Sequence, residues 1–387
     1  MARKKLLFLS DAVSATSGLG RITRDLAIRV HEHLGDLYEV ASIGYGGSGS
    51  RSIPFKEYHL HSIDNWLVPE LPAVWSDFVG NEEGILMCIW DMSRLYWLGM
   101  PETCPNSPLR QWAEKTRMRK WAYHAIDAEG PNGKLSHRIA QTMKGFDRVL
   151  DYSAFSSGIT GNSEHLPHGI DTTAFYPRPH KEARELFTER GFVGLKPTSL
   201  LVGIVATNQV RKNWQLGMET CKILFDRGHD LRLWAHVDVI DRYWSINNLV
   251  VDYGLHERVA VTPNRFTDDQ MAWMYSACDA TLGIGPEGFG YPIAESLACG
   301  IPSICGSYGA QAEFVPKRMQ IDPIAYFYEG AFCSKRPVHA PGMWADKVEK
   351  WAPSRSEQSL LPSRVDWDGP ELWPAWEEWF KKGIEPS

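Results

Sequence analysis

The sequence predicts an α/β protein with two doubly wound parallel-sheet domains that face each other across a cleft. The chain has 387 residues, which is more than a single hydrophobic core usually serves. Short apolar runs typical of buried strands alternate with segments typical of helices, and such alternation indicates parallel sheets covered on both faces. The alternation begins again after a turn-rich segment at residues 168–179, so we predict two domains joined there.

The first domain is predicted to comprise residues 1–168. Residues 5–10 (KLLFLS) form a short buried strand, and residues 17–35 form a helix that Ser17 can cap. Four further strands are predicted at residues 38–47, 84–90, 120–126 and 147–153.

The second domain is predicted to comprise residues 169–340. It opens with a strand at 199–207 and a helix at 212–228. Its further strands are predicted at 231–237, 258–263, 279–285 and 301–306, with helices at 267–278 and 291–300. Residues 341–387 form a Trp-rich tail that ends in a short amphipathic helix, and we expect this tail to pack back on the first domain.

Composition narrows the class of protein. Hydrophobic residues make up 43% and charged residues 23% of the chain, as in ordinary globular proteins. The net charge of −6 argues against a broad basic face for duplex DNA. The seven cysteines form no Cys-x-x-Cys pair, which favours reduced thiols and a cytoplasmic location. No apolar run is long enough to span a membrane.

The stretch EGFGYPIAE, from Glu287 to Glu295, has the pattern of an anion-binding turn. Gly288 and Gly290 leave the backbone accessible, and Pro292 suits the first turn of a helix. A helix start carries partial positive charge and attracts phosphate. Because a carboxylate would repel phosphate, we expect the two glutamates to accept hydrogen bonds from hydroxyl groups on either side of it. These features predict a site for a sugar nucleotide.

This stretch resembles the EGFG-x-P-x-x-E signature of the family 4-like retaining glycosyltransferases, which have the GT-B fold of two Rossmann-like domains. Three other segments resemble that family in the same order: TSGLGRITRDLA, LPHGIDTTAFYP and GIVATNQVRKNWQLGMETCKIL. The resemblance covers roughly residues 5–315. It implies a hexosyltransferase that moves a sugar from a nucleoside diphosphate sugar to an acceptor hydroxyl, with retention of configuration and without a metal or another cofactor.

The resemblance also implies roles for individual residues. Arg211 and Lys212 would hold the donor diphosphate and stabilise the leaving group, and Glu287 would contact the sugar. From the first domain, Gly18, Leu19 and Gly20 would approach the pyrophosphate or the sugar. The remaining predicted donor-binding residues are Gly288, Phe289, Gly290, Tyr291 and Glu295.

Two groups of residues in the first domain are candidates for the sugar and acceptor side. His124 and Asp127 follow a predicted strand, and either could bind the transferred sugar or orient the acceptor hydroxyl. Asp91 and Arg94 follow another strand and could line the acceptor side. The chain departs from the family pattern just before Glu287 and again after Glu313.

The sequence leaves several candidates for the donor nucleotide and for the acceptor. A UDP-sugar is the favoured donor, with a GDP- or ADP-sugar as an alternative. The acceptor could be a glycan, a lipid-linked sugar, a small metabolite or a modified (hydroxymethyl) base in viral DNA. The last of these would place the protein in the host cytoplasm. Two alternatives to a transferase stay open: another GT-B chemistry, such as a nucleotide-sugar epimerase or a phosphorylase, and a non-catalytic nucleotide- or glycan-binding module.

Overall fold

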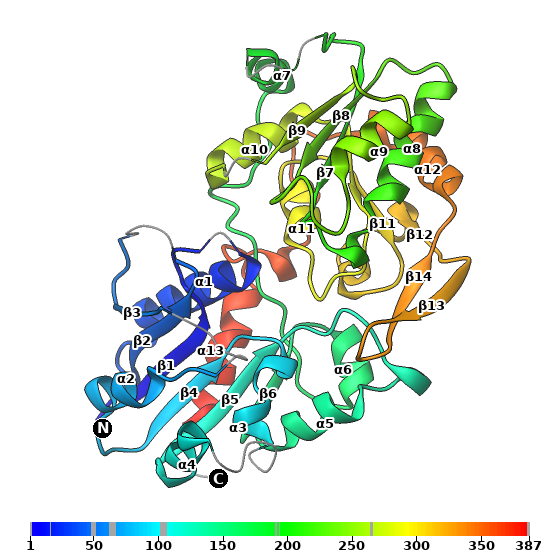
Figure 1. The fold of residues 1–387 in the computed structure, drawn as a ribbon. Coiled ribbons are helices and arrows are strands. Elements are labelled where there is room, and N and C mark those ends of the chain that lie inside the picture. The colour runs from blue at the N-terminus through cyan, green and yellow to red at the C-terminus, as the bar shows by residue number, and fades with distance from the viewer. Residues whose placement is uncertain are drawn as a thin grey trace. The chain divides into compact units, whose positions relative to one another are not determined.

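The computed structural model describes residues 2–384, except 16, 48–51, 62–66, 101–106, 190–191, 193 and 264–265. The chain divides into two compact units (Figure 1). Unit 1 consists of Met1–Leu166 together with Pro374–Ser387, and unit 2 of Pro167–Trp373. Each unit contains a six-stranded parallel sheet over the described residues, so the predicted α/β class is confirmed.

The sheet of unit 1 has the strand order β3-β2-β1-β4-β5-β6, and every pairing in it is parallel. Its strands are β1 (Lys4–Asp11), β2 (Tyr38–Tyr45), β3 (Lys56–Leu60), β4 (Gly84–Cys88), β5 (Met118–His124) and β6 (Arg148–Asp151). The helices are α1 (Gly18–His33), α2 (Leu71–Phe78), α3 (Tyr96–Gly99), α4 (Pro108–Lys115), α5 (His137–Lys144), α6 (Ala154–Thr160) and, from the end of the chain, α13 (Leu372–Gly383). Because helices cover both faces, β4 is buried at all its positions.

Helix α13 packs on unit 1 through its aromatic residues. Trp376 contacts Tyr123 edge-on with ring centroids 4.8 Å apart, and Trp379 contacts Trp121 at 5.2 Å. The tail as a whole does not follow the prediction, however. Helix α12 (Pro341–Trp351) belongs to unit 2, where it packs against α8, so the expected return to the first domain is wrong for this part of the tail.

The sheet of unit 2 has the strand order β12-β11-β10-β7-β8-β9. Its strands are β7 (Leu200–Val205), β8 (Leu231–His236), β9 (Val259–Thr262), β10 (Ala280–Gly283), β11 (Ser303–Gly306) and β12 (Gln320–Ile321). The helices besides α12 are α7 (His180–Glu189), α8 (Trp214–Asp226), α9 (Ile246–Asp252), α10 (Asp268–Ala277) and α11 (Tyr291–Ala298). Strand β7 lies between β8 and β10, so the chain changes direction across the sheet at the β7–β10 pair. Ligands of doubly wound sheets bind at the carboxyl ends of such a strand pair.

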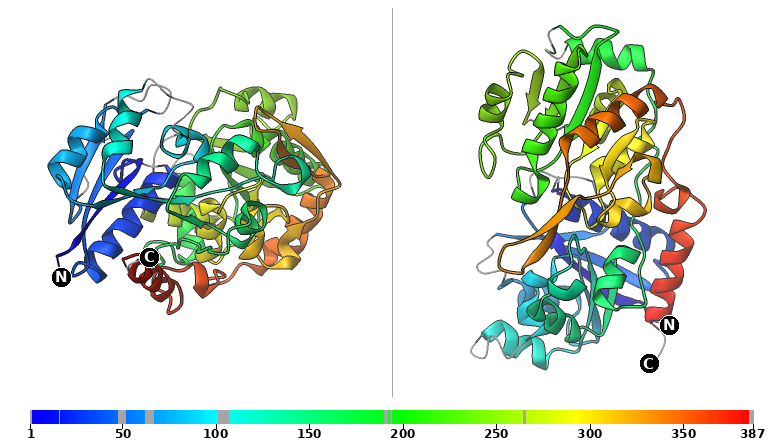
Figure 2. Two further views of the ribbon diagram at one scale, coloured as in Figure 1. Left: turned by 90° about the horizontal axis from the view of Figure 1, so that it is seen from below. Right: turned by 90° about the vertical axis from the view of Figure 1, so that its right-hand side faces the viewer.

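A two-stranded antiparallel hairpin, which the sequence did not predict, follows β12 in unit 2. It is formed by β13 (Ala325–Glu329) and β14 (Ser334–Val338) and forms a sheet of its own (Figure 2). The hairpin falls in the segment after Glu313 where the sequence departs from the family pattern. None of the helices in the described part of the chain has the length and apolarity needed to cross a membrane.

Candidate functional site

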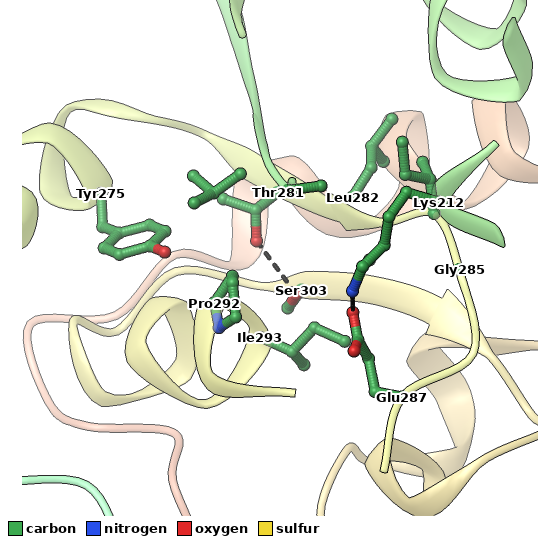
Figure 3. Close-up of a pocket in the computed structure, with 13 residues that line it drawn as sticks. Lys212, Tyr275, Thr281, Leu282, Gly285, Glu287, Pro292, Ile293 and Ser303 are labelled. Carbon is green, nitrogen blue, oxygen red and sulfur yellow. Dashed lines mark hydrogen bonds and ion pairs between the residues drawn. The ribbon is translucent and has the colours of Figure 1, made fainter. Parts of the chain in front are cut away.

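The loops after β7 and β10 bring two cations and a carboxylate together at the carboxyl edge of unit 2. Arg211 and Lys212 lie in a 3-10 helix, Val210–Lys212, and Glu287 follows β10. The Lys212 ammonium donates to Oε1 of Glu287, and Figure 3 shows the two side chains pointing toward each other. Arg211 Nη1 lies 3.3 Å from Oε2 of Glu287 and 2.8 Å from the carbonyl oxygen of Pro286. The structure therefore brings these three predicted residues into one cluster.

Gly285 allows the two loops to approach each other. A Cβ atom at this position would lie 2.5 Å from the carbonyl oxygen of Arg211 and 3.0 Å from Cα of Lys212. Both of these are backbone atoms that cannot rotate away. A side chain at residue 285 would therefore push the cations away from Glu287.

Opposing effects act on the pKa of Glu287. Burial favours the neutral carboxyl and raises the pKa, whereas the charges and hydrogen bonds of Lys212 and Arg211 lower it. The two cations together outweigh burial, so the pKa lies below its ordinary value. Glu287 is thus a carboxylate at neutral pH, and it offsets one of the two positive charges beside it.

The glycine turn after Glu287 leads into helix α11. Gly290, with φ of +106°, occupies the N-cap position, and no side chain caps the helix. Pro292 stands at the second helical position and has no N–H, while Ile293 N already donates to the Gly290 oxygen at 3.1 Å. An anion here would therefore meet the glycine turn and the helix dipole rather than the N–H groups of residues 292 and 293.

Glu295 lies one residue beyond the first turn of α11. It is buried, and its Oε2 accepts a 2.7 Å hydrogen bond from the hydroxyl of Tyr275 in α10. Tyr275 is a residue that the sequence analysis missed. No motif identifies it, because its relation to Glu295 arises only when α10 packs beside α11.

A small pocket lies between the ends of β7 and β10 and the start of α11. It is lined by Lys212, Tyr275, Glu287 and Pro292 together with Thr281, Ser303 and apolar residues (Figure 3).

The aromatic side chains of the turn have a packing role. The ring of Phe289 is buried, with its centroid 3.8 Å from that of His168 and 5.2 Å from that of Phe314. The ring of Tyr291 lies 5.0 Å from His168. Burial lowers the pKa of His168 well below its ordinary value, so its ring is neutral. Because the ring of Phe289 is buried in this packing, only the backbone of this residue is available to a ligand.

Asn208, also missed in the sequence analysis, holds the loop that carries Arg211 and Lys212. Its fully buried amide donates to the carbonyl oxygens of Val239 (2.9 Å) and Trp244 (2.7 Å), and its Oδ1 accepts from Trp244 N at 2.9 Å. These bonds tie the loop after β7 to the loop after β8. Asparagine is common in loops, so its type alone gives no signal of this role.

Gln311 does the same for the loop that carries Glu287. Its buried Oε1 accepts from Glu287 N at 3.0 Å, and its Nε2 donates to the carbonyl oxygen of Tyr308 at 2.9 Å. Ala310 N donates to the carbonyl oxygen of Glu287 at 2.9 Å. The backbone of Glu287 is therefore fixed on both sides.

In unit 1, the predicted glycine loop lies at the start of α1, where Gly18, Leu19 and Gly20 form the first turn. Ser17 caps this turn by accepting from Gly20 N at 3.1 Å, and its hydroxyl donates to Asp11 at the end of β1. Asp11 also accepts from the indole N–H of Trp90, which follows β4, at 3.0 Å. A carboxylate thus lies beside this helix start, which makes the turn better suited to hydroxyl groups than to phosphate.

The other predicted residues of unit 1 differ in accessibility. His124 is completely buried, and its Nε2 lies 2.9 Å from Oδ1 of the buried Asp151. Asp127 is only partly buried, in the segment that follows β5. Asp91 and Arg94 form an ion pair with each other at 3.4 Å after β4. Among the described residues, no group of three or more His, Cys, Asp and Glu side chains could hold a metal ion.

Two parallel-sheet units of this kind make up the GT-B fold. Sucrose-phosphate synthase from Thermosynechococcus elongatus is similar with a TM-score of 0.69 and 14% identity, over 99% of each chain. Anabaena HepE in complex with UDP and glucose gives 0.69 and 14% identity, over 98% of this chain and 99% of HepE. The catalytic domain of Arabidopsis thaliana starch synthase IV bound to ADP and acarbose gives 0.66 and 10%, over 99% and 98%. At these identities the likeness shows the fold alone.

A curated relative is similar in sequence as well. GDP-mannose-dependent α-(1-6)-phosphatidylinositol monomannoside mannosyltransferase from Mycolicibacterium smegmatis is 29% identical over 170 residues. The match spans 42% of this chain and 42% of that protein, well under two thirds of either. No family model matches the chain.

Proposed function

We propose that the protein is a retaining glycosyltransferase that moves a sugar from a nucleoside diphosphate sugar to an acceptor hydroxyl. The observation that carries the proposal is the cluster of Arg211, Lys212 and Glu287. It lies at the carboxyl ends of β7 and β10, where the strand order of the unit 2 sheet reverses. The similarity to a mannosyltransferase and to solved structures that hold UDP or ADP supports the donor class.

The cluster suits a diphosphate leaving group. As the bond between the sugar and the diphosphate breaks, negative charge grows on the phosphate oxygen, and fixed cations stabilise that charge. Glu287 accepts hydrogen bonds from both cations. We expect the donor phosphates to take over these contacts, which leaves the Glu287 carboxylate to accept hydrogen bonds from sugar hydroxyls.

Glu295 is suited to a second contact with the donor. Tyr275 occupies one of its carboxylate oxygens, and a carboxylate can accept several hydrogen bonds. We assign Glu295 to the ribose diol of the nucleotide, on the other side of the phosphates from Glu287.

In unit 1 we assign the substrate contact to Asp127 rather than to His124, because His124 and Asp151 are buried together. The turn from Gly18 to Gly20 would contact sugar hydroxyls, since Asp11 disfavours phosphate there. Asp91 and Arg94 would face the acceptor.

The bond changes follow from these roles. The acceptor oxygen forms a bond to the anomeric carbon on the face that the diphosphate leaves, and the proton of the acceptor hydroxyl passes to a diphosphate oxygen. This course retains the anomeric configuration. Arg211 and Lys212 perform the charge stabilisation, so we expect activity without added divalent cation.

Release of nucleoside diphosphate from UDP-, GDP- and ADP-sugars tests the proposal, in buffer with and without EDTA. We expect turnover of at least one donor, unchanged by EDTA, and loss of about a hundredfold in kcat in Lys212→Met. Lys222→Met is the matched control, because Lys222 pairs with Asp226 on the exposed side of α8. If both variants retain full turnover, the assignment of the site is wrong. If the product is a free epimer of the nucleotide sugar, the assignment as a transferase is wrong.

A further inference from the structure

The β13–β14 hairpin exposes an unusual set of aromatic side chains. Tyr326 is 45% exposed, Phe327 48% and Tyr328 52%, which is high for large rings. The preceding Ile324 is exposed as well. A cluster of large exposed rings often marks a binding site, because exposing apolar surface to water has a cost in free energy.

The register of the hairpin places the two tyrosines on one face. Tyr326 is opposite Pro337, and Tyr328 is opposite Lys335. Directly opposite residues in an antiparallel pair share a face, and residues two apart on one strand also share it, about 7 Å apart. Tyr326, Tyr328, Lys335 and Pro337 therefore form one surface, which we call the tyrosine face, while Phe327 points to the other side.

Neighbouring groups hold the tyrosine face in place. The ring of Tyr326 packs edge-on against the buried Tyr308 with centroids 5.6 Å apart. The ammonium group of Lys335 lies 4.2 Å from the centroid of the Tyr326 ring. The face thus offers two aromatic rings with hydroxyl groups and one ammonium group as hydrogen-bond donors, and the ring of Tyr326 is held by its neighbours.

The charge of the hairpin indicates what would bind there. It contains three charged side chains, Glu329, Lys335 and Arg336. Glu329 and Arg336 neutralise each other through a 2.7 Å hydrogen-bonded ion pair, so the hairpin carries no row of positive charges. A nucleic acid strand needs a row of cations along its phosphates, so it does not match this surface. A neutral carbohydrate does match, because its ring faces are apolar and its edges carry hydroxyl groups.

We propose that the tyrosine face binds a neutral oligosaccharide, and that the acceptor of the transferase is accordingly a sugar chain. The second half of this statement rests on the proposed function, whereas the binding itself does not. The rings of Tyr326 and Tyr328 stack on successive sugar rings, and Lys335 donates to their hydroxyl groups.

Binding of the full-length protein to a printed array of neutral and anionic glycans, without any donor, tests the inference. The affinity for the strongest glycan is then measured by calorimetry, with a single-stranded oligodeoxynucleotide as the competing ligand. We expect a neutral oligosaccharide to bind, and its affinity to fall at least tenfold in Tyr326→Ala and Tyr328→Ala. Tyr328→Trp, which keeps a flat ring, retains binding, and melting temperature verifies the fold of each variant.

Tyr243→Ala is the matched control, because Tyr243 is another exposed tyrosine of unit 2, in the loop before α9. No neutral glycan on the array, equal loss in the control, or binding of the oligonucleotide alone would each overturn the inference. Donor turnover is measured separately. If the protein turns over donor but binds no glycan, the inference about the tyrosine face is refuted and the proposed function stands. If it binds glycan but does not turn over donor, the proposed function is refuted and the binding at the tyrosine face stands.

Discussion

The hydroxyl of Tyr275 donates a 2.7 Å hydrogen bond to Oε2 of Glu295, and both side chains are buried. This bond fixes the rotation of the carboxylate that we assign to the ribose. Tyr275 is therefore a positioning residue for the donor, because it acts through Glu295.

Tyr275→Phe keeps the ring and removes the hydroxyl that makes this bond. A hydrogen bond to a charged group contributes about 1.5–3 kcal/mol, so we expect the KM for donor to rise roughly tenfold or more. The kcat value changes little, since the bond is not made to the reacting atoms. Steady-state kinetics measure both values, with Tyr243→Phe as control; a fall in kcat at constant KM would contradict the positioning role.

Asn208→Ala removes the amide that joins the loops after β7 and β8. It leaves the carbonyl oxygens of Val239 and Trp244 and the N–H of Trp244 without this partner. Three lost hydrogen bonds of about 1 kcal/mol each lower the free energy of unfolding by roughly 3 kcal/mol, as urea denaturation would measure. The loop with Arg211 and Lys212 also loses its support, so we expect weaker nucleoside diphosphate binding. Unchanged stability and affinity would refute this role.

Gly285→Ala places a Cβ atom 2.5 Å from the carbonyl oxygen of Arg211. The loop must move, and we expect donor turnover to fall at least tenfold because near-ångström displacements in a site have large effects on rate. Gly158→Ala is the control, since a Cβ atom there meets nothing within 4 Å. Full activity of Gly285→Ala would show that the two loops need not approach so closely.

His236 makes the stability of the protein depend on pH. Burial lowers the pKa of this histidine from 6.5 to about 4, although a hydrogen bond with Thr262 acts in the opposite direction. Between pH 6.5 and 4 the unfolded chain therefore binds a proton that the folded protein does not. Stability is complete above pH 6.5 and decreases as the pH falls toward 4.

His236→Asn isolates this effect. The difference in free energy of unfolding between the variant and the natural protein is measured by urea denaturation at pH 7 and pH 4.5. We expect the variant to lose less stability than the natural protein over this range. His168, whose pKa burial also lowers, contributes equally to both proteins and cancels in the comparison. A parallel loss in both would contradict the assignment.

The sequence predicted the strands and helices that follow a clear apolar pattern, and the motif from Glu287 to Glu295. It did not predict the contacts that support the site. Asn208 and Tyr275 act through residues that are distant in sequence, and nothing in their own neighbourhood shows it. His124 was a candidate because it ends a strand, but the burial that pairs it with Asp151 depends on packing.

The β13–β14 hairpin was not predicted from the sequence for a related reason. Residues 325–329 (AYFYE) have no alternation of buried and exposed positions, because the hairpin is a separate two-stranded sheet with exposed side chains on β13. Sequence patterns detect a strand by its buried face. A ribbon whose rings face solvent gives no such pattern.

The buried cluster of Lys212 and Glu287 allows stability and function to be separated. Lys212→Met removes one of the two cations that pair with the Glu287 carboxylate among the described residues, which lowers the free energy of unfolding by up to about 3 kcal/mol. Lys212→Met combined with Glu287→Gln removes both charges, so we expect the double variant to recover most of the stability in urea denaturation. It does not recover donor turnover, because the leaving group still lacks its cation. Recovery of turnover would show that Lys212 has a structural role only.

Calorimetric titration of UDP, GDP and ADP into the natural protein and its variants tests most directly whether this cluster holds the donor diphosphate. We expect at least one nucleoside diphosphate to bind, with an affinity at least tenfold lower in Arg211→Ala and in the Lys212→Met, Glu287→Gln double variant, and unchanged in Lys222→Met. Binding that is equally strong in all of these proteins would place the phosphates elsewhere and contradict the account.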